Sequence, residues 1–112
     1  MTEMTEIKNI TNRLIEFRNE REWEQFHNPK DLAIALSIES NELLETFLWK
    51  KHDEATREKV EEELADVFTY AFLIAEKYDF NVAEIINRKI DRNNEKYPVE
   101  KAKGNAKKYT EF

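Results

Sequence analysis

Apolar residues recur at intervals of three and four along most of the chain, which is the spacing of one face of an amphipathic helix. This pattern predicts a first helix at about residues 5–21 and a second at about residues 29–49. It predicts a third helix over about residues 60–78 and a fourth over about residues 82–97. Four helices joined by short connections indicate a four-helix bundle.

Residues that favour helix ends support these boundaries. Asn28 stands before a proline and can cap the second helix, because its side chain can accept a backbone N–H of the first turn. Asn81 followed by Glu84 resembles a capping box at the start of the fourth helix. Pro98 stops that helix, and residues 99–112 are predicted to form a tail.

The composition changes this picture only by excluding sheets and a second domain. The chain has one Gly and two Pro among 112 residues, and tight hairpins depend on such residues. Hydrophobic residues make up 40% and aromatic residues 12%, which is enough for one packed core at this length. We therefore expect an all-α single domain over residues 1–112, with its core at about residues 5–98.

Charge and cysteine content exclude several function classes. The net charge of −6 would repel a nucleic acid polymer, although a nucleotide could bind if a divalent cation stood between its phosphates and the protein. There is no cysteine, so a disulfide scaffold and a thiolate metal site are excluded. No apolar run is long enough to cross a membrane, and the first residues do not resemble a signal peptide. We expect a soluble, cytoplasmic protein.

Two pairs of acidic residues are the candidates for chemistry. Glu39 and Glu42 lie three apart in the second predicted helix, and Glu63 and Asp66 lie three apart in the third. Each pair shares one helix face, so two facing helices could bring four carboxylates together. Such a cluster is repulsive unless cations neutralise it, and oxygen donors alone indicate Mg²⁺, with Mn²⁺ as a substitute.

Two other interpretations of these acids remain open. They could be solvated surface groups, which are frequent in a chain with 24 acidic residues, or they could form ion pairs with Lys or Arg. Context favours the metal site, because Glu39 and Glu42 interrupt the apolar run at residues 32–44. Asp66 likewise lies within the apolar residues 64–68, and a carboxylate in such a run needs a partner.

A basic face and several aromatic residues could bind the phosphates and base of a nucleotide. Lys89, Asn93 and Lys96 share one face of the fourth helix and could hold phosphates, or they could form an ordinary solvated face. Flat apolar side chains and a few polar groups suit a nucleobase, although aromatic residues more often pack in a core. The candidates for this role are Trp23, Phe26, His27, Trp49, Tyr70 and Tyr97.

Several stretches resemble the all-α nucleoside triphosphate pyrophosphatases, the superfamily that contains MazG and the dimeric dUTPases. The most specific is FRNEREWEQFH followed by NPKDLA at residues 17–33, which looks like the dCTP pyrophosphatase branch. The resemblance covers nearly the whole chain, through residues 47–50, 62–67, 89–93, 96–98 and 108–112.

The resemblance implies an activity and a set of site residues. Members are helical bundles that assemble as dimers or tetramers and cleave between the α and β phosphates, releasing a nucleoside monophosphate and pyrophosphate. By this resemblance, dCTP or a modified dCTP is the expected substrate, Lys89 and Asn93 lie near its phosphates, and Lys96 stands where relatives often have Arg. The residues that resemble the Mg²⁺ ligands are Glu39, Glu42, Glu63 and Asp66, and those that match the base-pocket region are Trp23, His27, Trp49 and Tyr70.

Alternatives to this function are a dUTP-type or broad-specificity pyrophosphatase, and a non-enzymatic helical module that binds a partner protein. In the module, the acids would be surface groups and the aromatic residues would form the interface. Metal-dependent turnover of a nucleotide distinguishes the enzymes from the module.

Overall fold

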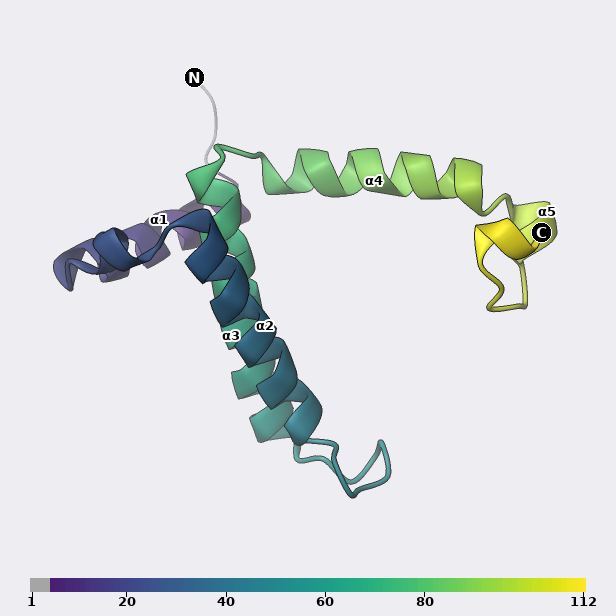
Figure 1. The fold of residues 1–112 in the computed structure, drawn as a ribbon, viewed down its shortest axis with the longest axis horizontal. Helices are drawn as coiled ribbons and strands as arrows, with labels where there is room; N and C mark the ends of the chain where they lie inside the picture. Colours follow the sequence, from purple (N-terminus) through teal and green to yellow (C-terminus); the bar gives the residue numbers. More distant parts are fainter. Residues whose placement is uncertain (1–4) are drawn as a thin grey trace. The chain divides into compact units, whose positions relative to one another are not determined.

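Helices make up nearly all of the regular structure in the computed structural model, which describes residues 5–112 (Figure 1). No strand occurs within that range, so the all-α prediction is confirmed. In chain order the elements are α1 (Glu6–Glu20), η1 (Trp23–Phe26), α2 (Pro29–Glu45), α3 (Arg57–Lys77), α4 (Val82–Lys96), α5 (Val99–Ala102) and η2 (Tyr109–Glu111). None of these described helices is long and apolar enough to cross a membrane.

Side-chain caps begin three of the long helices, and two of them were predicted. Asn28 Oδ1 accepts the backbone N–H of Asp31 at 2.9 Å at the start of α2. Asn81 Oδ1 accepts the backbone N–H of Glu84 at the same distance at the start of α4. Each cap satisfies a backbone donor that has no partner within the first helical turn. The predicted starts of the second and fourth helices are therefore confirmed.

The second helix ends earlier than predicted, at Glu45 rather than near Trp49. The Thr46 hydroxyl donates to the carbonyl of Leu43 at 2.7 Å, and the backbone N–H groups of Thr46 and Phe47 bond three residues back. These tighter bonds end the α-helical pattern. Trp49 lies beyond the end, with a left-handed φ of 63° and a wholly exposed side chain. The predicted end was wrong because apolar residues continue in the sequence beyond the point where these hydrogen bonds end the helix.

Residues 5–79 form one compact unit, in which α2 and α3 run antiparallel side by side (Figure 1). Leu32 of α2 is 1% exposed, and Leu73 and Ala75 of α3 are also buried. Burial of these side chains stabilises the helix pair because their apolar surface leaves water. The α1 helix contacts α3, and Arg18 near its end is among the buried residues.

The second compact unit, Phe80–Phe112, contains α4, α5 and η2. The ring of Tyr97, at the end of α4, meets the rings of Tyr109 and Phe112 edge to face, at centroid distances of 6.0 and 5.9 Å. The predicted tail at residues 99–112 is therefore structured and folds back on Tyr97. The expectation of a single domain over residues 1–112 stays a prediction.

Candidate functional site

Three of the four predicted acids converge between α2 and α3. Glu39 of α2 and Glu63 and Asp66 of α3 each offer one carboxylate oxygen, and these oxygens lie within 4.8 Å of one another. The three differ in exposure: Glu63 is 7% exposed, Glu39 is half-buried and Asp66 is exposed. The antiparallel pairing of the helices thus brings together residues that are 24 or more positions apart in the sequence.

Glu42, the fourth predicted acid, lies outside this group of three but acts electrostatically on Glu39. The pKa of Glu39 is raised to about 7. Burial is the largest cause, because it disfavours the charged form, and the neighbouring Glu42 side chain is the next. The negative charges of Glu42, Asp66 and Glu63 raise it further. The negative charges of the four carboxyl groups therefore act on one another at this point between α2 and α3.

Two oxygens of the cluster are buried without a hydrogen-bond partner. They are Oε2 of Glu39 and Oε2 of Glu63, while Oε1 of Glu63 accepts from Lys59 Nζ at 2.9 Å. A buried carboxylate oxygen without a partner is costly, and several such hard donors at one point fit a divalent cation that prefers oxygen ligands. The donor set that the chain presents at this point therefore fits Mg²⁺ or Mn²⁺.

Tyr70 borders the acidic cluster one turn after Asp66 on α3. Its pKa is raised first by burial and then by the charges of Glu39, Asp66 and Glu42. The phenol therefore keeps its proton at neutral pH and can donate a hydrogen bond.

Trp23 and His27 lie in or next to η1, before α2 begins. The Trp23 ring meets the Phe17 ring edge to face at 5.7 Å and is 43% exposed, which leaves part of the indole free to contact a ligand. His27 is half-buried, and its Nδ1 atom is buried without a hydrogen-bond partner. Burial lowers the pKa of His27, and the positive charges of Arg18 and Lys77 lower it further. The imidazole is therefore neutral at pH 7.

The sequence of this chain is similar to those of a known protein family. The sequence model of the MazG-like family matches residues 34–112, a range that includes all four predicted acids. The chain belongs to the MazG-like family. The predicted resemblance is thereby confirmed.

Curated relatives and a solved structure agree with this assignment of the MazG-like chain. The dCTP pyrophosphatase 1 proteins of Mus musculus and Homo sapiens are each 38% identical to it over an alignment of 105 residues, which covers 87% of this chain. The chain spans about 62% of the length of these relatives. A solved pyrophosphatase from Archaeoglobus fulgidus superposes with a TM-score of 0.80 at 36% identity, covering 88% of this chain and 97% of that one.

The other predicted site residues of this MazG-like chain belong to the connection after α2 and to the second unit. Trp49 stands in the connection between α2 and α3 and is wholly exposed. Lys89, Asn93 and Lys96 lie on α4, and Tyr97 follows it, all within the second unit. Lys89 is exposed, whereas Asn93 and Lys96 are half-buried. Their roles in nucleotide binding stay predictions.

Sequence reasoning missed two residues beside the candidate site. Lys59 bonds Glu63 from four positions earlier on the same helix, a spacing that could have been recognised. Arg18 bonds Glu76 from 58 positions away, and no pattern along the chain signals that pairing.

Proposed function

We propose that this chain is an Mg²⁺-dependent nucleoside triphosphate pyrophosphohydrolase that acts in the cytoplasm on free nucleotides. It cleaves between the α and β phosphates of dCTP or a modified dCTP, which releases a nucleoside monophosphate and pyrophosphate and sanitises the nucleotide pool. The observation that carries the proposal is the cluster of Glu39, Glu63 and Asp66, with its two unpartnered buried oxygens. The names of the curated relatives suggest the substrate.

Glu39, Glu63 and Asp66 would hold the metal, with Glu42 against Glu39 as the fourth carboxylate. A bound Mg²⁺ supplies charge neutralisation for the triphosphate and lowers the pKa of a water molecule. The side chains of the protein would position the attacking water and accept its proton. Glu42, or Glu45 at the end of α2, would orient the attacking water or accept its proton.

Binding of the nucleotide would fall to the other predicted residues. Lys89, Asn93 and Lys96 offer two charges and an amide to the phosphates, and Lys96 acts as a point charge rather than a bidentate fork. Because His27 is neutral, one of its ring nitrogens can donate a hydrogen bond and the other can accept one, so the ring could bond a polar group of a base. The aromatic surfaces proposed for the base are Trp23, Trp49, Tyr70 and Tyr97.

Release of pyrophosphate from a panel of nucleotides tests this function. We expect Mg²⁺-dependent release that is fastest for dCTP and 5-methyl-dCTP, slower for dUTP, dTTP, dATP, dGTP and the ribonucleotides, and absent in EDTA. Release from many nucleotides would support the pyrophosphohydrolase reaction but not the preference for dCTP. The chain would then be a dUTP-type or broad-specificity enzyme. If no nucleotide is cleaved with Mg²⁺ or Mn²⁺, the chain is instead the helical interaction module.

We also propose that the chain works as a homodimer or homotetramer. Large apolar side chains are exposed at i, i+4 spacing on both helices of the pair: Ile34 and Ile38 on α2, and Leu64 and Phe68 on α3. Ile38 and Phe68 are 52% and 51% exposed, and large apolar side chains left exposed in rows on two packed helices favour an interface with another chain.

Light scattering after size exclusion should therefore give a mass of at least two 13.5 kDa chains. Ile38→Glu should lower that mass, because a charge at an apolar interface is costly to bury. Ser37→Glu is the matched control, since it adds the same charge at the neighbouring exposed position. A single 13.5 kDa species for the unaltered protein would contradict the assembly.

A further inference from the structure

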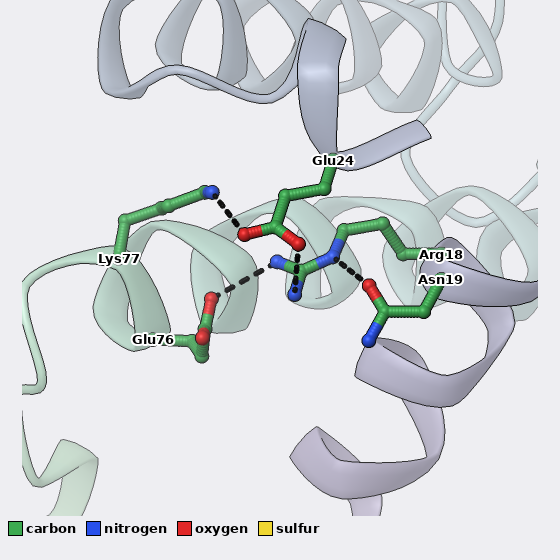
Figure 2. Close-up of polar contacts among 5 residues, drawn as sticks. All are labelled: Arg18, Asn19, Glu24, Glu76 and Lys77. Carbon is green, nitrogen blue, oxygen red and sulfur yellow. Dashed lines mark hydrogen bonds and ion pairs between the residues drawn. The ribbon is translucent and has the colours of Figure 1, made fainter. Parts of the chain in front are cut away.

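Arg18 is a buried charge that the proposed chemistry does not use. It is 3% exposed, near the end of α1. Its Nη1 donates to Glu76 Oε2 at 3.0 Å, its Nε donates to Asn19 Oδ1 at 3.2 Å, and its Nη2 lies 3.7 Å from Glu24 Oε2. Lys77 Nζ lies 3.6 Å from the other oxygen of Glu24. We call these five residues the Arg18 network (Figure 2).

The Arg18 network joins three elements of the first unit. Arg18 comes from α1, Glu24 from η1, and Glu76 and Lys77 from the end of α3 (Figure 2). The Glu24 carboxylate lies between the two cations, and each of its oxygens faces one of them. The guanidinium suits such a junction because its planar fork can bond several acceptors in fixed directions.

The η1 segment needs an external support of this kind. It has only four residues, and it is preceded by Glu22, whose φ of 55° is left-handed for a residue with a side chain. That conformation costs on the order of 1 kcal/mol and persists only when the surroundings hold it. Besides the bonds within this short helix, the His27 backbone donates to the Glu24 carbonyl and the Gln25 side chain donates to the Glu22 carbonyl.

We infer that Arg18 and Glu24 are positioning residues, which fix η1 against α3 and thereby hold Trp23 and His27 in place for a nucleobase. Trp23 is next to Glu24 in the sequence, and His27 donates its backbone N–H to the Glu24 carbonyl at 3.0 Å. The positions of both residues therefore depend on the position of Glu24. The same α3 helix carries Glu63 thirteen positions before Glu76, about 20 Å along the axis. One rigid helix thus sets the separation between the base-binding segment and the acidic cluster. The inference rests on the proposed function for the identity of the ligand.

Kinetics separate positioning from a purely structural role. Glu24→Gln removes the carboxylate charge at a side chain that is 59% exposed, so the fold should survive. We expect its KM for dCTP to rise about 10-fold with kcat within about twofold, since the acids are untouched. Arg18→Lys, which keeps the charge and loses the fork, should do the same. Glu20→Gln is the control, because Glu20 lies outside the network, 73% exposed, and pairs with Arg21.

Titration of His27 by NMR supplies a measurement that does not require turnover. If Glu24→Gln frees η1, His27 leaves its buried site near Arg18 and Lys77, and its pKa should rise toward the ordinary value. If η1 stays in place, loss of the anion leaves the pKa of His27 unchanged or lower. The latter result, or a lower kcat with unchanged KM, would overturn the positioning role. Absence of turnover in the unaltered protein would instead count against the proposed function alone.

Discussion

Glu63→Gln is expected to lower kcat/KM for pyrophosphate release about 10³-fold and to leave the protein folded. The substitution keeps the shape of the side chain and removes one negative charge from the metal ligands, and loss of such electrostatic stabilisation is worth several kcal/mol in the transition state. In EDTA, the free energy of unfolding should be about unchanged, because the lower repulsion among Glu39, Glu63 and Asp66 offsets the loss of the charged pair with the partly exposed Lys59. Asp66→Asn should behave in the same way.

Steady-state kinetics with Mg²⁺ and urea unfolding in EDTA measure the two effects separately. Glu62→Gln is the matched control, because Glu62 is the neighbour of Glu63, is 71% exposed and also pairs with Lys59, at 4.0 Å. It should leave both quantities unchanged, since exposed pairs contribute little. Full activity in both Glu63→Gln and Asp66→Asn would remove the metal-site assignment.

Mg²⁺ is expected to stabilise the folded protein, and Glu39→Gln is expected to abolish most of that effect. A ligand present at 100 times its Kd raises the free energy of unfolding by about 2.7 kcal/mol, which corresponds to about 10 °C in Tm for a chain of this size. The increase arises because the ion binds the folded cluster, whose two unpartnered buried oxygens have no equivalent in the unfolded chain.

Thermal unfolding with Mg²⁺, and with NaCl at matched ionic strength as the control, measures this stabilisation. The NaCl series should show no comparable rise, because screening acts on exposed charges without occupying the cluster. An equal rise in Glu39→Gln and in the unaltered protein would mean that Mg²⁺ binds at another place.

Helices were predictable from the sequence because their apolar periodicity and caps agree. Asn28 and Asn81 cap the helices that they were expected to cap, and the pattern located α3 to within a few residues. The end of α2 was not predictable from periodicity, because apolar residues continue through Leu48 and Trp49 after the Thr46 hydroxyl has bonded to Leu43. Local hydrogen bonding decided that boundary.

The acidic cluster was predictable in its members and not in its geometry. Spacing alone gave Glu39 and Glu42 the same role on one helix face, whereas the structure groups Glu39 with Glu63 and Asp66 and leaves Glu42 outside that group. The choice depends on where the facing helix passes, which a one-helix pattern does not contain. Long-range pairs such as Arg18 with Glu76 are hidden for the same reason.

The α3 helix carries Glu63 and Asp66 in one half and Glu76 and Lys77 at its end, which limits how the length of this protein can change. Insertion or deletion of one residue between the two pairs would rotate one of them by about 100° relative to the other. The acids and the ion-paired residues could not then both keep their partners. Changes in length should be tolerated instead in the connection at residues 46–56, where the chain is not helical and a shift moves neither pair.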